Sequence, residues 1–439
     1  MAAVAAALFT DLIPLYPVYA VMFADPTVPG AGLNPAQISA LFIIWSVTSF
    51  VAEVPSGIVA DRLSRRRLLM ISPVITGGGF ALWTFTPSFV AFAVGFVLWG
   101  VGGSLRSGTA QALLYDELDE LGLAARYVRV AGRVRAAEAI GVLAGTALAG
   151  PLLAVGGYRA AGVAAVLSCL LAAMAAWVLP ETPRHLRRRR SEADDPTVAI
   201  APGAIAPGAI APGADDQTVA DAATPGWRGV VGDARRHLRT HPVVRRMLVL
   251  VVALTWVGAL DEYLPFLAES FLGEGDSSPA SVAVLMLVVG VGDVVGGLAA
   301  YRRVTMRTLG GWLGVAALCL LAGAWWASGA MSGVVWQPAG IVLVAIAFGV
   351  FGWALVVADA LLQDRLSARS RATVTSVAGV GEEAVAILAF ASWALGSVWL
   401  SPPALFAMAA TPYLVLSLVI WSASIRSGTG AMTSRASGR

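Results

Sequence analysis

Apolar residues occur along this chain in long blocks, separated by short polar turns that are often rich in arginine. A helix needs about 20 apolar residues to cross a bilayer, and the blocks do not alternate in the way that a half-buried strand would. The pattern therefore predicts an all-α polytopic membrane protein with twelve transmembrane helices. The expected spans are 4–23, 38–60, 68–86, 88–114, 129–155, 158–179, 243–271, 280–300, 308–328, 337–362, 373–399 and 404–424.

Composition supports this class. Of the 439 residues, 58% are hydrophobic and 13% are charged, and the mean hydropathy is +0.76. A soluble domain carries about 25% charged residues. The first span has no basic segment before it and contains Asp11, Pro14 and Pro17, so we expect it to be the first helix rather than a cleaved signal peptide.

The basic residues predict the orientation. All 30 are arginines. They cluster after the second, fourth, sixth, eighth and tenth spans, whereas the loops between the other spans carry almost no arginine, with Arg159 as the clear exception. By the positive-inside rule, the arginine-rich loops and both termini are cytoplasmic. The net charge of +3 then reflects topology, and nucleic-acid binding is not expected. The bias to arginine and alanine favours a bacterium with a GC-rich genome, and hence the inner (cytoplasmic) membrane.

A polar gap divides the chain into two halves. We expect an N-terminal six-helix bundle at 1–180, a cytoplasmic linker at 181–241, a C-terminal six-helix bundle at 242–425 and a cytoplasmic tail at 426–439. The linker contains RHLRRRR and three copies of AIAPG, a composition that favours an extended tether; an interaction tail is the alternative. The histidines all lie there, so proton chemistry within the membrane would use carboxylates. They are His185, His237 and His241.

The two halves repeat each other. ALLYDEL at 112–118 and ALLQDRL at 360–366 each end the fourth span of their half. In the span that follows, Arg126 and Glu138 recur as Arg371 and Glu383 at the same separation. Internal duplication of this kind places a binding cavity between two bundles, near the bilayer midplane.

The loop after the second span reads GIVADRLSRRRLL. It resembles the loop signature of the major facilitator superfamily, written roughly G-x-x-x-D-R-x-G-R-[RK]-x-x-L, although Ser64 stands where the family usually has glycine. The matching residues are Gly57, Asp61, Arg62, Arg65, Arg66 and Leu69. With the layout of six plus six spans, the resemblance implies the fold of that superfamily and a transporter similar to bacterial proton-coupled drug or metabolite exporters.

The same loop has a physical interpretation. Gly57 allows two helices to approach closely, Asp61 can accept hydrogen bonds from a helix N-terminus, and Arg65 can reach Asp116 in ALLYDEL. In proteins that this chain resembles, such a network latches the outward-facing state. The alternative is a solvated basic turn that only fixes topology.

The corresponding loop of the second half departs from this pattern. In GGLAAYRR at 296–303, Ala300 replaces the acid, although Arg302, Arg303 and Asp364 remain. We therefore expect the first half to carry the main gate.

The sequence of the fifth span bears on the direction of transport. Its sequence GVLAGTALAGPLLAVGG resembles the glycine-proline signature of antiporters in the family, through Gly141, Gly145, Gly150 and Pro151. The spacing of these residues is longer than in that pattern, and small residues also serve ordinary close packing of helices. Exporters of the family often have an arginine early in the fourth span, where this chain reads GFVLWG. Arg106 lies deeper in the same span and can take its place.

Charged side chains within the spans are candidates for the substrate and proton path. Each costs ~2.5–3.5 kcal/mol at the bilayer centre, so they should line a wet cleft or pair with one another. We expect Glu138 to pair with Arg106, with Arg135 on the same helix as the local alternative. The candidates are Asp11, Arg106, Glu138, Asp261, Glu262, Glu382 and Glu383.

Glu382 and Glu383 are the first choice for the proton carrier, because burial beside another acid favours the protonated form of a carboxyl group. Asp261 with Glu262 comes second and Asp11 third; a structural hydrogen bond is the alternative for each. Aromatic residues in the spans can contact an amphipathic solute or form interfacial belts. They include Trp45, Trp99, Tyr115, Trp256, Tyr263 and Trp353.

Other classes of function fit less well. A chain without lysine has no phosphate-binding loop of an ATP-driven pump, and it shows no nucleophile, metal or cofactor signature of an enzyme. We therefore predict a monomeric secondary active transporter that exports an amphipathic small molecule against protons. A proton symporter for a polar nutrient, or a non-transporting sensor or lipid-handling protein, is the alternative.

Overall fold

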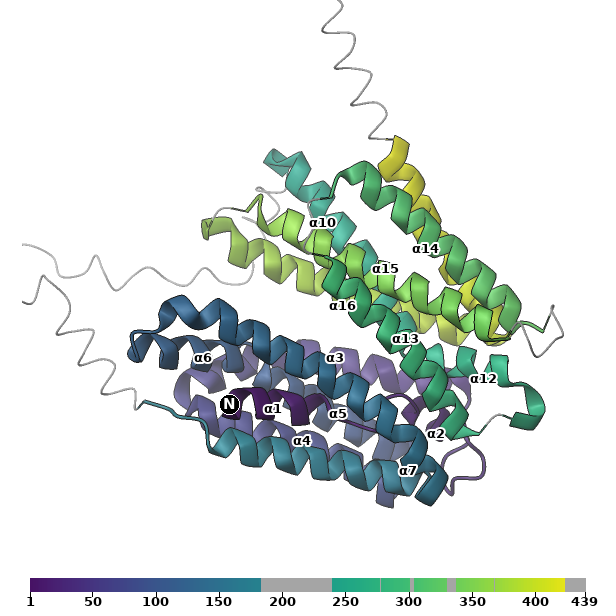
Figure 1. The fold of residues 1–439 in the computed structure, drawn as a ribbon, viewed down its shortest axis with the longest axis horizontal. Coiled ribbons are helices and arrows are strands. Elements are labelled where there is room, and N and C mark those ends of the chain that lie inside the picture. The colour runs from purple at the N-terminus through teal and green to yellow at the C-terminus, as the bar shows by residue number, and fades with distance from the viewer. Residues whose placement is uncertain (183–238, 277, 301–303, 330–336, 367, 423–439) are drawn as a thin grey trace, which may run out of the picture.

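The computed structural model describes the chain except for residues 183–238, 277, 301–303, 330–336, 367 and 423–439 (Figure 1). Its N-terminal part is built of helices packed side by side. They are α1 (Ala2–Asp11), α2 (Tyr19–Ala24), α3 (Pro35–Arg62), α4 (Arg65–Phe85), α5 (Phe89–Arg106), α6 (Thr109–Glu120), the 3₁₀ turn η1 (Ala124–Arg126) and α7 (Tyr127–Trp177). Most of the central linker, Arg302, Arg303 and the C-terminal tail lie outside the described residues.

The C-terminal part is likewise helical. Its elements are α10 (Pro242–Leu254), α11 (Trp256–Asp261), α12 (Leu264–Asp276), α13 (Pro279–Ala299), α14 (Met306–Ala327), α15 (Gln337–Gln363), α16 (Ala368–Gly396) and α17 (Pro402–Ala409). The all-α class predicted from the hydrophobic pattern is confirmed over the described residues.

In the described part of the chain, 10 helices are long and apolar enough to cross a membrane. One of them, Ala124–Trp177, has 54 residues, enough for two crossings, and its backbone leaves the helical conformation at Gly156 and Gly157. The broken segment formed by α1 and α2 provides one further crossing. The arrangement therefore agrees with the twelve spans predicted from the sequence.

Four of the expected spans are broken rather than continuous, which corrects the sequence prediction. The twelfth is interrupted at Ala410, between α17 and a helix over residues 411–422. The other three have longer or repeated breaks. The first is interrupted between α1 and α2, where Pro14 and Pro17 lie, because proline cannot continue a helix. The fourth is interrupted between α5 and α6 at Gly108, whose φ of +69° favours glycine. The seventh is interrupted on both sides of α11. Such irregular backbone is tolerated at membrane depth only where protein or water covers it.

Charged residues lie at the breaks of the first, fourth and seventh spans. Asp11 is the last residue of α1, Arg106 is the last of α5, and Asp261 is the last of α11, followed directly by Glu262. A carboxylate at a helix C-terminus is disfavoured by the helix dipole. Asp11 and Asp261 therefore do not stabilise the helices that they end, and their positions need another explanation.

The two bundles form a V (Figure 1). They meet along two helix pairs, α3 with α16 and α7 with α13. They approach each other at the end of the molecule where α2 and α12 lie, and they are apart at the end where α6 and the start of α10 lie. Because α6 and the arginines that directly follow it lie at the second of these ends, the open end is the one predicted to be cytoplasmic.

Candidate functional site

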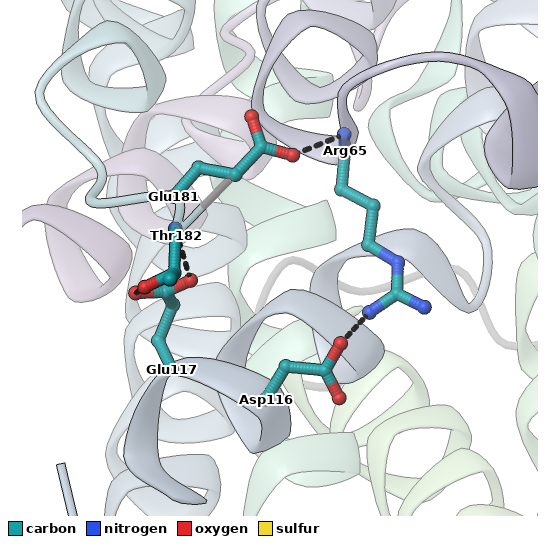
Figure 2. A network of polar contacts seen from close by, with 5 residues as sticks. All are labelled: Arg65, Asp116, Glu117, Glu181 and Thr182. Carbon is teal, nitrogen blue, oxygen red and sulfur yellow. Dashed lines mark hydrogen bonds and ion pairs between the residues drawn. The ribbon is translucent and has the colours of Figure 1, made fainter. Parts of the chain in front are cut away.

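The loop between α3 and α4 is fixed to α6 at the open end of the molecule (Figure 2). Ser64 is the N-cap of α4, and its hydroxyl oxygen accepts a hydrogen bond of 3.2 Å from the backbone N–H of Arg67. This capping role explains why serine serves where the superfamily usually has glycine. The guanidinium of Arg65 pairs with the carboxylate of Asp116, so the structure brings together the two residues expected to meet.

The end of α7 joins the same corner. The carboxylate of Glu181 accepts hydrogen bonds from the hydroxyl of Ser64 and, at 2.7 Å, from the backbone N–H of Arg65. The backbone N–H of Thr182 donates to the buried carboxylate of Glu117 at 2.8 Å. Figure 2 shows Arg65, Asp116, Glu117, Glu181 and Thr182, which converge from α4, α6 and the segment after α7. Because this cluster lies at the end predicted to be cytoplasmic, we name Ser64, Arg65, Asp116, Glu117, Glu181 and Thr182 the cytoplasmic corner.

Other residues of the predicted gate differ from expectation. Gly57 has no atom of another helix within 4 Å of the position of a Cβ, which corrects the expected close approach of two helices there. The reason is the separation of the bundles at this end of the molecule. Arg66 donates to the carbonyl oxygen of Leu179 at 3.4 Å. The side chains of Asp61 and Arg62 lie outside the described ones.

The partner of Arg106 also differs. Its guanidinium lies 3.7 Å from the carboxylate of Asp11, not paired with Glu138 as we expected. Asp11 reaches this place because α1 packs closely along α7: Gly141 lies against the carbonyl oxygen of Leu8, and Gly145 against the backbone of Ile13. The glycines of the fifth span thus hold the acidic end of α1 beside Arg106.

Carboxylates of the C-terminal half accept hydrogen bonds from the N-terminal half. The Tyr19 hydroxyl donates to Glu262, and the Ser46 hydroxyl donates to Glu383. Beside the first of these bonds, the hydroxyls of Ser39 and Tyr263 lie 2.6 Å apart. We name the bonds to Glu262 and Glu383 the carboxylate bridges. Glu382 is partly buried and Asp261 is exposed, and no bridge to the other half is found at either residue among the described contacts.

Aromatic rings flank the bridges. In the N-terminal half, the ring of Trp99 stacks on Tyr16 with 5.2 Å between centroids and on Trp45 with 4.9 Å. In the C-terminal half, the buried ring of Tyr263 stacks on Trp393 at 4.0 Å. Three other predicted aromatics lie elsewhere: Tyr115 packs on Tyr127 near the cytoplasmic corner, and Trp256 and Trp353 pack against the core of the C-terminal half.

Comparison with known proteins identifies the family. The family model of the Major Facilitator Superfamily matches residues 1–390. The chain belongs to this superfamily. The resemblance first indicated by the loop after the second span is therefore confirmed, and a transporter embedded in a membrane is the function of the family as a whole.

Individual relatives of this superfamily member are distant. The inner membrane transport protein YajR of Escherichia coli (strain K12) is 28% identical over 170 residues, which are 36% of this chain and 34% of that protein. The match thus spans about a third of the relative's length.

Solved structures share the fold over nearly the whole chain. The nucleoside transporter NupG has a TM-score of 0.67 at 13% identity, covering 95% of this chain and 96% of its own. A D-xylose-proton symporter has a TM-score of 0.64 at 16% identity, covering 96% and 95%. The peptide transporter POT, in complex with sulfate, has a TM-score of 0.63 at 13% identity, covering 97% and 94%. At such identities the likeness establishes the fold alone.

Sequence reasoning missed several residues of the site in this superfamily member. Glu181 and Thr182 directly follow an apolar span, and no motif in the sequence marks them as part of the site. The serine before α4, in contrast, is typical of an N-cap. Tyr16, Tyr19 and Ser46 are ordinary residues of apolar spans, and only the packing of the bundles reveals their partners.

Proposed function

We propose that this protein is a secondary active transporter that moves a small molecule by rocker-type alternating access and couples this movement to protons. Export of an amphipathic compound by proton antiport is the favoured mode. The proposal is carried by one observation, the carboxylate bridges, in which acids of one bundle are held by hydroxyls of the other.

The bridges offer a direct coupling between protonation and bundle movement. A hydroxyl donates a stronger hydrogen bond to an ionised carboxylate than to a neutral acid. Gain of a proton by Glu262 or Glu383 therefore weakens the contact between the halves, and loss of a proton strengthens it. A carrier needs such a link between its cargo and its conformation, because a ligand shifts an equilibrium only by interacting differently with the two states.

The proposal assigns roles to the remaining candidates. Residues 1–180 and 242–425 act as the two rocking bundles, joined by the cytoplasmic linker 181–241 and followed by a cytoplasmic tail at 426–439. Asp11, Arg106 and Glu138 line the path in the first bundle; Asp261 and Glu382 do so in the second. The protein acts as a monomer.

The cytoplasmic corner is proposed to act as a rigid part of the gate rather than as the lock itself. Arg65 and Asp116 both belong to the N-terminal bundle, and their ion pair is formed while the bundles are apart at this end. A lock must instead bond across the halves. We propose that the corner holds the loop between α3 and α4 in one shape while the cytoplasmic end opens and closes.

Antiport is favoured over symport by two features. The glycine-proline pattern from Gly141 to Pro151 resembles that of antiporters, and the rings of Tyr16, Trp45 and Trp99 offer apolar wall area. Symport remains the second candidate, and the D-xylose-proton symporter that shares the fold is one example of that mode.

Proton flux in liposomes tests the proposal. Vesicles containing the purified full-length protein and a pH-sensitive dye are loaded with one compound from a panel and diluted into compound-free buffer. Antiport predicts that the lumen acidifies as the compound leaves, whereas symport predicts that it becomes alkaline. Because the compound gradient fixes the direction of flow, the sign does not depend on how the protein is oriented.

Two variants and a control locate the coupling. We expect Glu383→Gln and Glu262→Gln to abolish or strongly reduce the proton signal, while Asp119→Asn, an exposed acid at the end of α6, retains it. Full coupling in both glutamine variants would exclude the bridges as proton carriers. Absence of a signal with every compound would contradict proton-coupled transport.

A further inference from the structure

The contact between the bundles along α3 ends at a defined level. Successive residues on one face of this helix meet the C-terminal half: Ser39 contacts Tyr263, Phe42 packs on Tyr263 and Phe390 at 5.3 and 5.4 Å, and Ser46 bonds to Glu383. The same face continues with Phe50, which is 47% exposed. Ser46 lies about 11 residues, or ~16 Å, into α3, which is near the middle of a ~30 Å bilayer core.

The second pair of helices separates at a similar depth. Gly150 of α7 lies against Ala280 and Val284 of α13, and Leu143 lies against Gly290. Beyond these contacts Ile140 is exposed. On α13, Val291, Val295 and Leu298 are exposed as well, toward the end predicted to be cytoplasmic. The contact between the bundles thus ends at a similar depth in the membrane along both helix pairs, α3 with α16 and α7 with α13. The bridge between Ser46 and Glu383 lies at the edge of this contact.

An aromatic stack stands at this edge. Trp45, the neighbour of Ser46, stacks on Trp99 with an interplanar angle of 26°, and Trp99 stacks on Tyr16 at 12°. These three side chains are partly exposed, whereas Phe42 and Phe96 beside them are fully buried. The stack therefore keeps part of its ring surface uncovered by other residues of the described protein.

The charge at the edge is negative. Arg106 is paired with Asp11, so these two side chains largely neutralise each other. The partner that the structure gives Glu383 is the neutral hydroxyl of Ser46, and among the described residues no cation pairs with its carboxylate. An anionic solute would be repelled here, while a cation would gain from the carboxylate and from the ring of Trp45.

We propose that this edge binds an organic cation with a flat aromatic ring system, which stacks on Trp45 and directs its positive charge to Glu383. The inference rests on the proposed transport function and names its class of substrate. It also predicts competition between substrate and proton, because a cation on Glu383 and a proton on the same carboxylate exclude each other.

Binding to the full-length protein in detergent tests the substrate class without any gradient. Ethidium is a flat aromatic cation, phenanthridine has a similar ring system that is uncharged at neutral pH, and choline is a cation without rings. We expect ethidium to bind at least tenfold more tightly than either of the others. Equal affinity for ethidium and phenanthridine, or tighter binding of choline, would overturn the proposal.

Variants locate the binding position. Trp45→Ala and Glu383→Gln should each weaken ethidium binding about tenfold, the order of a cation–π contact or an ion pair that is partly shielded from water. Trp45→Phe should stay within about threefold of the parent protein, which shows that the fold tolerates substitution at this position. Trp325→Ala, on an exposed face of α14, should have no effect. Unchanged ethidium affinity in both Trp45→Ala and Glu383→Gln would overturn the proposal.

Failure of this inference is distinct from failure of the transport proposal. If other compounds drive proton flux while ethidium neither binds nor elicits a signal, the transport proposal is supported and the aromatic-cation site is contradicted. If ethidium binds as expected but no compound moves protons, the aromatic-cation site is supported and proton coupling is contradicted.

Discussion

At the scale of single residues, the neutral hydroxyls are as important to the site as the acids. The carboxylates of Glu262 and Glu383 attract notice in a sequence because charge within a membrane span is costly. Their partners Tyr19 and Ser46 do not, because tyrosine and serine are common in such spans. Yet these hydroxyls decide which half of the molecule each acid bonds to.

Loss of one hydroxyl should change the balance between conformations without unfolding the protein. Ser46→Ala removes the donor to Glu383, and a hydrogen bond to a charged group contributes ~1.5–3 kcal/mol. We therefore expect the population with separated extracellular ends to rise about tenfold or more. Spin labels at Thr86 and Val398, in a background without Cys169 and Cys319, measure this separation as a longer distance.

The matched control for this measurement is Ser270→Ala. Among the described residues, the hydroxyl of Ser270 donates within its own helix, to the carbonyl oxygen of Phe266 at 3.0 Å. The distance distribution should therefore match that of the labelled parent. A distribution that is also unchanged in Ser46→Ala would show that the bridge does not hold the bundles together.

Residue chemistry also shows where prediction from the sequence succeeds and where it fails. Arg65 and Asp116 were expected to meet because both lie at the cytoplasmic ends of their spans, and the structure pairs them. Arg106 was assigned to Glu138, but it pairs with Asp11. The depth of a residue in the membrane follows from the length of the hydrophobic span. Which neighbouring helix its side chain meets depends on packing, and the hydrophobic pattern does not specify packing.

At the scale of elements, the lengths of the spans were predictable and their interruptions were not. A bilayer imposes a minimum apolar length on every crossing, so the pattern marks nearly all of them. A break requires only one or two residues, such as Pro14 and Pro17 or Gly108, and similar residues elsewhere are tolerated within a helix. Pro73, for example, lies inside the continuous helix α4.

The close packing of α1 on α7 leads to a prediction at this scale. A Cβ at position 145 would overlap the backbone of Ile13, so Gly145→Val should displace α1 and destabilise the protein by about 1–3 kcal/mol, as overpacking does. Thermal unfolding in detergent, followed by tryptophan fluorescence, should show a lower midpoint. Gly132→Val lies on the same helix with no atom within 4 Å of the new Cβ, and it should have a much smaller effect.

This prediction has a clear contrary outcome. If Gly145→Val and Gly132→Val unfold at the same temperature, close contact between α1 and α7 does not stabilise the protein. The glycines of the fifth span would then need an explanation other than packing.

At the scale of the whole molecule, the V shape leads to a prediction about access by water. Phe50 lies on the face of α3 beyond the closed contacts and is 47% exposed, whereas Phe42 is fully buried between the bundles. In a protein without its native cysteines, we expect Phe50→Cys to react with a water-soluble maleimide in inside-out vesicles. Phe42→Cys should be protected.

The comparison also requires a residue that is exposed to lipid rather than to water. Leu318 of α14 is 58% exposed and lies in an apolar helix at the periphery of the C-terminal half (Figure 1). Leu318→Cys should not react, because the reagent does not enter the bilayer. Equal labelling at positions 42 and 50 would show that the interface does not open in the way the structure indicates.

The bend at Gly156 and Gly157 has a consequence for how the protein is made. Only these two residues reverse the chain between the fifth and sixth crossings, and Gly157 has a φ of +59° that other residues rarely adopt. No loop is available to keep the fifth crossing in place while the sixth is still being synthesised. We therefore expect the two crossings to enter the bilayer together, as a single helical hairpin, after both have left the ribosome.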